Sequence, residues 1–353
     1  MIQRIILILF IALFFSSCGN RQRNFFDGQV KKIQFSREYF LEGKKMDTDT
    51  IGNFYPKLFG SYVILRTHSL PYSARIYTVD DFTLVGTFFN RGQGPQDFLG
   101  FSIVRREYPR LWVMDAQNRR LSVLNTEKGF GDDSFQIERT YSLRGISHPF
   151  NVFYVNDTLL WVKSFDMGNS RLSYYKFNPQ TEEKIGAGRI MYNFPVTVSL
   201  IHKMLSGADA IHPDGTKIVS VTRAFNQIDI LNLKDVTRNL SVTTGDRLTS
   251  FRHVNNTHRD DLREYYLGIP VVNEHEIFVM HHSEQPNQTE VRIITWEGEP
   301  IAILHLNRRL RGFDVDASLN FLYGIEPESE ALYRFDLRNL NLRPTLKNIS
   351  DKS

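Results

Sequence analysis

The densest group of side chains able to bind a metal ion lies in one polar segment, residues 253–261. It contains His253, His258, Asp260 and Asp261, and imidazole and carboxylate groups are adequate ligands for zinc and other divalent ions. A spacing of five residues between two histidines on an irregular loop sets no ligand geometry. We therefore expect exposed loop histidines and no resident cofactor, and retain these four residues as alternative metal ligands only.

A second set of side chains is suited to binding a ligand without reacting with it. Aromatic rings stack on sugars, and guanidinium groups contact acidic partners. The aromatic and basic residues of predicted loops are Tyr72, Arg105, Arg106, Tyr108, Tyr265, Tyr266, Arg308 and Arg309. Ordinary packing explains any single one of them more simply, so the set is a group of candidate ligand contacts and not a defined site.

The signatures of several enzyme classes are missing from the chain. It has no Gly-x-Ser-x-Gly elbow and no His-Glu-x-x-His helix, and its single cysteine makes neither an internal disulfide nor a thiolate zinc cluster. A pair of carboxylates for glycosidic cleavage leaves no such signature, because the two groups meet in space and not in sequence. Catalytic residues are therefore unknown from the sequence.

Charge and composition exclude other classes. Among 353 residues, 43 Lys and Arg face 39 Asp and Glu, a net charge of +4. This balance is unlike that of an acidic disordered chain or of a protein that coats nucleic acid. With 41% hydrophobic and 13% aromatic residues, the chain is expected to form a large core and to be rich in strands.

The elements that position these side chains are strands in a repeat. Six runs of alternating apolar and polar residues begin at positions 76, 121, 172, 228, 291 and 332. The five steps span 256 residues, and a mean step of about 51 residues is typical of a propeller blade. A further apolar strand precedes each run: Tyr62–Leu65, Leu111–Met114, Leu159–Val162, Lys217–Val221, Glu276–Met280 and Phe321–Gly324. The sequence thus predicts an all-β fold, a six-bladed β-propeller of four-stranded blades.

The ends of the propeller are predicted from its closure. Residues 29–40 have the pattern of a strand, and a terminal strand that completes the last blade removes an exposed sheet edge. We predict one propeller domain over residues 29–345 and a C-terminal tail over 346–353. The best candidate helix is the short polar run at residues 259–266.

Two motifs indicate particular propeller types. The segment 111–124, with Asp115 and Asn118 in its turn, resembles the strand-turn-strand core of an NHL-type blade, where Asp and Asn bond nearby backbone groups. The segment Gly92-x-Gly94-Pro95-x-Asp97-Phe98 resembles an inter-blade element of lipoproteins of the TolB-like six-bladed type.

In that inter-blade element, each residue has an expected structural task. The two glycines allow a tight turn, and Pro95 stiffens it. Asp97 caps backbone amides, and Phe98 packs between sheets. The TolB-like resemblance implies architecture and no particular activity.

The predicted propeller also raises one enzymatic alternative. Propeller enzymes of the calcium-dependent lactonase type place Glu, Asn and Asp from several blades around the central channel, where oxygen ligands suit the ion. The comparable residues near predicted strands are Asp115, Asn151, Asn226, Asp229 and Asp314. Their spacing singles out none of them. Calcium or zinc is therefore expected as a cofactor only under this enzymatic alternative.

The first residues have the pattern of a secretory signal. An apolar run from Ile5 to Phe15 follows Arg4, and eleven residues are too few to cross a bilayer, which takes about 20. Ser16-Ser17-Cys18-Gly19 resembles the lipobox of bacterial lipoproteins, in which the cysteine is acylated. We predict a signal peptide over residues 1–17, lipidation at Cys18, and a tether over residues 18–28.

These observations combine into one functional expectation. We expect a lipid-anchored propeller of the cell envelope, at the outer membrane because Gly19 is not the aspartate of the inner-membrane sorting rule, with the leaflet open. It acts as a non-catalytic binding or scaffolding module for an envelope protein or glycan, with no nucleic-acid partner. The alternative is an envelope hydrolase with a metal or carboxylate site at the channel.

Overall fold

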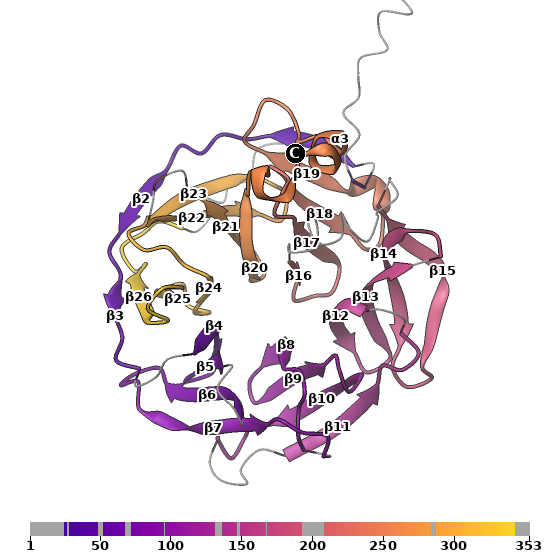
Figure 1. Ribbon diagram of the computed structural model, residues 1–353, viewed down its shortest axis with the longest axis vertical. Helices are drawn as coiled ribbons and strands as arrows, with labels where there is room; N and C mark the ends of the chain where they lie inside the picture. Colours follow the sequence, from indigo (N-terminus) through magenta and orange to yellow (C-terminus); the bar gives the residue numbers. More distant parts are fainter. Residues whose placement is uncertain are drawn as a thin grey trace, which may run out of the picture.

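The fold is a ring of six β-sheets around a central channel (Figure 1). The computed structural model describes residues 25–26, 28–48, 52–67, 72–94, 96–130, 136–146, 149–166, 168–192, 208–283, 285 and 287–342. Within these residues the chain is almost entirely β, which confirms the predicted all-β six-bladed propeller. Each sheet runs from an inner strand at the channel to an outer strand at the rim.

The first three blades are continuous in sequence. Blade 1 contains β4 (Asn53–Phe59), β5 (Tyr62–Thr67), β6 (Tyr72–Thr78) and β7 (Leu84–Asn90). Blade 2 contains β8 (Ser102–Glu107), β9 (Arg110–Asp115), β10 (Arg120–Asn125) and β11 (Gln136–Ser142). Blade 3 contains β12 (Pro149–Asn156), β13 (Leu159–Asp166), β14 (Arg171–Asn178) and β15 (Glu183–Met191).

The last three blades each gain a strand from the N-terminal segment. Blade 4 contains β16 (Asp209–Ile211), β17 (Lys217–Val221), β18 (Ile228–Asn232), β19 (Leu240–Thr243) and β1 (Gln29–Lys32). Blade 5 contains β20 (Tyr266–Val272), β21 (Glu276–His282), β22 (Thr289–Thr295), β23 (Pro300–Leu306) and β2 (Glu38–Leu41). Blade 6 contains β24 (Gly312–Val315), β25 (Phe321–Ile325), β26 (Leu332–Asp336) and β3 (Lys44–Lys45).

This N-terminal segment corrects the predicted closure. The strand that completes blade 6 is β3, antiparallel to β26, and not residues 29–40. Those residues instead form β1 and β2, which add parallel fifth strands to blades 4 and 5. The segment therefore passes around the outside of half the ring (Figure 1), and it covers three sheet edges that would otherwise be open.

The predicted strand pairs are the two middle strands of the six blades, and both faces of these strands are covered. In β18 the first four residues are all buried, including Asp229, although the run alternates between apolar and polar residues. The polar Ser122 of β10 and Ser173 of β14 are buried as well. Neighbouring blades pack on both faces of each sheet, so a polar position in the alternation does not face water.

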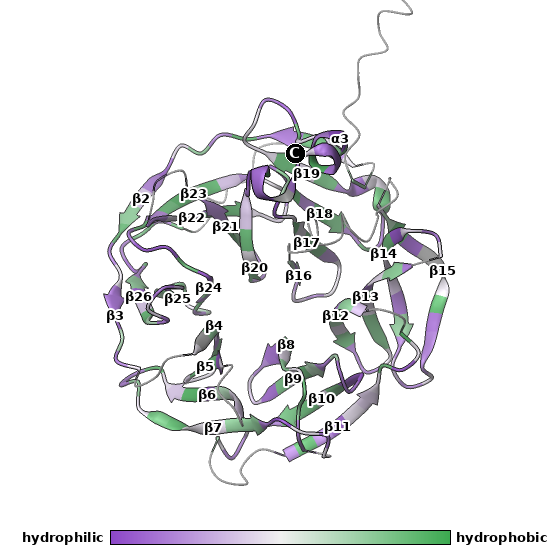
Figure 2. Ribbon diagram, in the orientation of Figure 1, coloured by the Kyte–Doolittle hydropathy of each residue, from purple (hydrophilic) through white to green (hydrophobic). Residues whose placement is uncertain are grey.

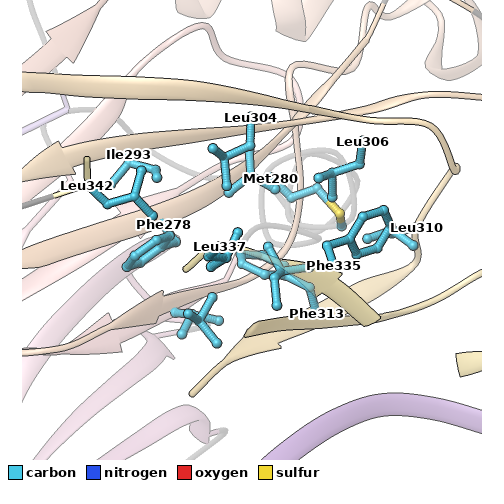
Figure 3. Close-up of a cluster of buried hydrophobic side chains, with 14 of the residues drawn as sticks. Phe278, Met280, Ile293, Leu304, Leu306, Leu310, Phe313, Phe335, Leu337 and Leu342 are labelled. Atoms are coloured by element: carbon cyan, nitrogen blue, oxygen red, sulfur yellow. The ribbon is translucent and has the colours of Figure 1, made fainter. Parts of the chain in front are cut away.

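The cores lie between blades. The buried apolar residues form six clusters within the described residues, one at each junction between neighbouring blades. The cluster between blades 5 and 6 brings Phe278, Met280 and Ile293 together with Phe313 and Phe335 (Figure 3). Removing such apolar surfaces from water is the main favourable contribution to joining the blades.

Two local assignments differ from the sequence expectations. The helix α3 spans Phe251–Asn256, earlier than the predicted run, whereas Arg259–Asp261 is a single 3-10 turn and Tyr266 begins β20. Ser250 caps α3 by accepting a hydrogen bond from the His253 amide. No helix in the described part of the chain is long and apolar enough to cross a membrane.

The tether predicted over residues 18–28 contains two residues of the core. Phe25 and Phe26 are 3% and 5% exposed. The Phe25 ring lies 4.4 Å from that of Phe225, and the Phe26 ring lies 4.6 Å from that of Tyr192. Phe25 and Phe26 thus hold the chain at the junction of blades 3 and 4. Cys18 and the predicted tail, 346–353, lie outside the described residues.

Candidate functional site

The channel contains a cavity of about 1070 Å³, bounded by the inner strands of several blades. Its walls come mainly from β8, β12, β16 and β20, and Lys57 of β4 completes one side. Figure 2 shows that β8 is hydrophilic at the channel, in contrast to the hydrophobic β9 and β10 behind it. The cavity is large enough for a ligand of several rings or residues, so its charged walls define the candidate site.

One charged cluster joins blades 1, 2 and 6. Arg106 of β8 forms a two-pronged ion pair with Asp314 of β24, in which Nη2 lies 2.7 Å from Oδ1 and Nη1 contacts Oδ2. Arg106 Nη1 also donates to the Leu58 carbonyl at 2.6 Å, and the Leu58 amide donates to Asp314 at 2.7 Å. These bonds fix the guanidinium against the first and last blades.

Lys57 adds a second cation beside the same carboxylate. It is half-buried and lines the cavity. Burial lowers the pKa of the Lys57 ammonium, with Asp314 opposing and Arg106 adding to that effect. Burial by itself would raise the pKa of Asp314, but Arg106 and Lys57 outweigh it and lower this pKa. One ionised carboxylate therefore faces two cations.

Arg105 occupies the opposite face of β8. Its guanidinium donates to the Val155 carbonyl at 3.1 Å and to Glu107 at 2.9 Å. The same group lies 5.6 Å from the ring centroids of both Trp112 and Tyr154. Arg105 is thus held between a carboxylate and two aromatic rings, where cation–π attraction contributes.

A second charged cluster is sealed between blades 3 and 4. Lys163 of β13 and Asp209 of β16 have side chains that are 1% and 2% exposed, and Lys163 Nζ lies 3.0 and 2.9 Å from the two carboxylate oxygens. The Tyr174 hydroxyl also donates to Asp209 at 3.0 Å. Burial disfavours the ammonium, but Asp209 and Tyr192 together outweigh it and raise the pKa of Lys163.

Asp229 lies behind this pair in the wall of blade 4. Gln227 donates to its two oxygens at 2.8 and 3.0 Å, and the Ser241 hydroxyl donates at 2.5 Å. Burial raises the pKa of Asp229 to about 7 despite these bonds and the nearby Lys163. This carboxyl is therefore close to half-protonated at neutral pH, but it is not among the residues that line the cavity.

The rim of the cavity is made by hairpins of blades 4 and 5. His212 has Nδ1 2.7 Å from Asp214 Oδ1 and Nε2 3.2 Å from the Glu274 carbonyl. Its ring also contacts Trp296 at a centroid distance of 4.8 Å. Glu274 and His275 line the same rim and are exposed.

The structure places only two of the eight predicted ligand contacts at the cavity. Arg105 and Arg106 both line the cavity, while the other six residues of the set do not. Tyr108 is 55% exposed at the turn after β8, and Tyr266 is buried.

The remaining four residues are distributed over other parts of the ring. Tyr72 begins β6, and Tyr265 packs beside Arg263. Arg308 lies over Tyr333, and Arg309 is near Glu328.

The candidate metal ligands do not converge. His253 is an exposed residue of α3, and His258 is paired at 3.7 Å with the exposed Asp260. Asp261 ends the 3-10 turn. Among the described residues, no three His, Cys, Asp or Glu side chains are placed to hold a metal ion together.

The motif residues of blades 1 and 2 have structural partners. Asp97 accepts from the Gly94 amide at 3.1 Å, and a Cβ on Gly92 would clash with the Asp97 carboxylate. Phe98 is fully buried in the core between blades 1 and 2. Pro95 lies outside the described residues.

Asp115 and Asn118 shape the turn after β9. Asp115 accepts from the amides of Leu99 and Gly100 at 3.0 Å and from Asn118 Nδ2 at 2.7 Å. Both residues therefore organise the backbone away from the cavity. Of the residues compared with lactonase-type enzymes, Asn151 lines the cavity and Asp314 adjoins it through Arg106.

Lys57, Lys163 and Asp209 were missed at the sequence level. One signal was available for Lys163, since a lysine within the apolar strand Leu159–Asp166 must find a counter-ion if both faces are covered. No local signal identified Lys57 or Asp209, because their partners come from other blades.

Similarity to known proteins is confined to structure. No family model and no curated protein matches this chain. A member of the DUF4221 family from Bacteroides vulgatus superposes with a TM-score of 0.56 at 11% identity, over 84% of this chain and 95% of that one. A candidate exported protein from Bacteroides fragilis superposes with a TM-score of 0.51 at 10% identity, over 87% and 99%. At these identities the likeness shows the propeller fold alone.

Proposed function

We propose that this protein is a non-catalytic binding module of the cell envelope, anchored by lipid at Cys18, with the channel cavity as its ligand site. One observation carries the binding proposal. The buried carboxylates at the channel wall, Asp209 and Asp314, are each engaged by a cation and by further hydrogen-bond donors. The charged side chains thus form a fixed, polar surface around a ligand-sized space.

This arrangement favours binding over acid–base chemistry. A general acid needs a pKa near the working pH, whereas two cations lower the pKa of Asp314. Asp209 accepts three hydrogen bonds from Lys163 and Tyr174, which hold it in one position. Asp229 has a pKa near 7 but lies behind the wall.

The ligand we propose is a segment of an envelope protein or a glycan. The cavity combines polar groups with the apolar surfaces of Phe150, Phe153 and Tyr154 on β12, and such mixed walls suit both sugar faces and side chains. We retain the TolB-like resemblance of residues 92–98 and the NHL-like resemblance of residues 111–124 as part of this proposal, for the rigid ring architecture that they imply.

The envelope location has two supports. The first residues have the pattern of a lipoprotein signal, and one structural neighbour is a candidate exported protein. The buried Phe25 lies seven positions after Cys18, so an anchor at Cys18 would hold the junction of blades 3 and 4 within about 25 Å of the membrane. We propose the outer membrane, in keeping with Gly19.

Acylation is tested by Cys18→Ser in a Gram-negative host. We expect the wild-type chain to incorporate radiolabelled palmitate and to sediment with membranes. The variant should incorporate none and should not sediment with them. Unchanged labelling and fractionation of Cys18→Ser would contradict the anchor without affecting the binding proposal.

Binding is tested by obstructing the cavity. Ser102→Trp places a large ring on β8 at the cavity wall, and Thr181→Trp, at an exposed turn between β14 and β15, is the matched control. Against a panel of glycans and peptides, a ligand should raise the melting temperature of the wild type and of Thr181→Trp, but not of Ser102→Trp. It should also be recovered chemically unchanged, and its turnover would contradict a non-catalytic role.

A further inference from the structure

We infer that Lys57 and Arg106 form a subsite for one anionic group of the ligand, a carboxylate or a phosphate ester. The inference rests on the proposed function, since it uses the same cavity. It adds the chemical class of ligand that this cavity accepts. Its basis is a positive charge at the channel wall that the fold itself does not balance.

The charged groups of the wall can be matched pair by pair. Arg105 is paired with Glu107, and Lys163 with Asp209. Arg106 is paired with Asp314. Lys57 shares that last carboxylate, and no other acidic group of the described residues contributes to its pKa. The group of Lys57, Arg106 and Asp314 therefore carries one excess positive charge.

Donors as well as charge are available at this position. A guanidinium has five N–H donors, and Arg106 uses three of them on Asp314 and the Leu58 carbonyl. Its remaining N–H groups and the Lys57 ammonium have no acceptor among the described residues, and both side chains line the cavity. The Arg106 side chain is 26% exposed and belongs to the cavity lining, so we infer that these donors face the ligand space.

The position of Arg106 is fixed before any ligand arrives. Its ion pair with Asp314, which is 0% exposed, and its bond to the Leu58 carbonyl tie it to two other blades. A guanidinium held in this way loses little freedom on binding. An anion would also relieve the repulsion between Lys57 and Arg106, which contributes to the lowered pKa of Lys57.

Two other charged positions fit this role less well. The ammonium of Lys163 is sealed from solvent and bound by both oxygens of Asp209. Glu274, an acidic side chain of the same cavity with no ion-pair partner among the described residues, is exposed at the rim and would repel an anion there. The excess positive charge of Lys57 and Arg106 inside the cavity therefore suits a ligand with one anionic group.

The test uses three probes of similar size with the full mature chain: phenyl phosphate, benzoate and neutral benzyl alcohol. Binding is measured by calorimetric titration of the wild type, Lys57→Gln and Lys234→Gln. Lys234 is exposed and remote from the cavity lining, so its variant makes the same change in net charge elsewhere. We expect at least one anion to bind the wild type and Lys234→Gln more tightly than benzyl alcohol. We expect Lys57→Gln to bind that anion about tenfold more weakly.

The outcomes separate the subsite from the proposed function. Equal anion affinity in Lys57→Gln and Lys234→Gln would overturn the subsite, as would tighter binding of benzyl alcohol. If neutral panel ligands still bind and Ser102→Trp still blocks them, the binding function stands without the subsite. If no probe or panel ligand binds, both fail. Preference for phenyl phosphate or for benzoate identifies which anion the subsite takes.

The pH dependence gives a second readout. Because the pKa of Lys57 is lowered, its positive charge is lost at a lower pH than for an ordinary lysine. Anion affinity should therefore fall on the alkaline side before an exposed lysine would titrate, and Lys57→Gln should lack this fall. An identical alkaline profile in both proteins would contradict the assignment of Lys57.

Discussion

Two charged clusters contribute to the wall of the channel cavity, and they differ in their balance of charge and in their exposure to solvent. Lys163 and Asp209 form a matched pair whose side chains are at most 2% exposed. Lys57 and Arg106 share the single carboxylate of Asp314, and both line the cavity. A sealed, matched pair stabilises one arrangement of blades, whereas an accessible, unmatched cation has an interaction left to make.

The comparison shows why buried charge alone does not identify a functional site. Both clusters lie where blades meet, and both shift pKa values through burial and neighbouring charges. In one, the cation has its pKa raised because the fold supplies its partner. In the other, burial lowers the pKa of Lys57, and the carboxylate of Asp314, which it shares with Arg106, does not offset this effect. The two lysines therefore differ in how completely the fold balances their charge.

The largest effect is expected from Lys163→Met, which leaves Asp209 buried without its counter-ion. Breaking such a pair costs about 3–5 kcal/mol of the free energy of unfolding, measured by urea denaturation. Lys217→Met is the control, because its pair with Glu297 is exposed and such pairs contribute at most about 1 kcal/mol. Equal losses in the two variants would contradict a structural role, and adding Asp209→Leu to Lys163→Met should restore stability.

A smaller, pH-dependent effect is expected from Asp229. Its pKa is raised from 3.8 to about 7, so between these values the folded chain holds a proton that the unfolded chain releases. The contribution of Asp229 to stability should then be greatest below the lower value and fall as pH rises toward 7, by up to about 1.4 kcal/mol per pH unit.

Asp229→Asn isolates this contribution. Urea denaturation at pH 5 and at pH 8 should show the variant gaining stability relative to the wild type at the higher pH. The gain should be a few kcal/mol at most. If the free energies of unfolding of the variant and the wild type differ by the same amount at pH 5 and at pH 8, Asp229 does not titrate in this range.

The smallest effect on stability is expected from Lys57→Gln. Since the fold lowers the pKa of this ammonium, removing the charge should leave the free energy of unfolding unchanged or raise it by at most about 1 kcal/mol. Arg106→Gln should destabilise the protein more, because it removes three hydrogen bonds and leaves the buried Asp314 without its arginine partner. If Lys57→Gln destabilised the protein as strongly as Arg106→Gln, Lys57 would be a structural residue.

The sequence predicted the ring better than the cavity. Strand pairs such as Leu111–Met114 with the run from Leu121 were recognisable because their alternation and spacing are local. The turn of Asp115 was also recognisable, since its partners Leu99, Gly100 and Asn118 lie within 16 residues. Local chemistry is visible in a sequence when its partners are near in the chain.

The candidate site depends instead on distant partners. Arg106 and Asp314 are separated by 208 positions and meet only because the ring closes. Arg106 was chosen for its residue type, and nothing near Lys57 in the chain indicated its partner. The closing strand was misplaced for the same reason, because β1 and β2 have ordinary strand patterns and only the ring determines which blade each one joins.

A crystal structure of residues 19–353 with saturating phenyl phosphate tests the central claim, that the channel is a ligand site with a cationic end. We expect the phosphate within hydrogen-bond distance of Lys57 Nζ and of the unused N–H groups of Arg106, with the ring toward β12. Phenyl phosphate bound elsewhere on the protein, with the channel empty under conditions where titration shows saturable binding, would contradict it.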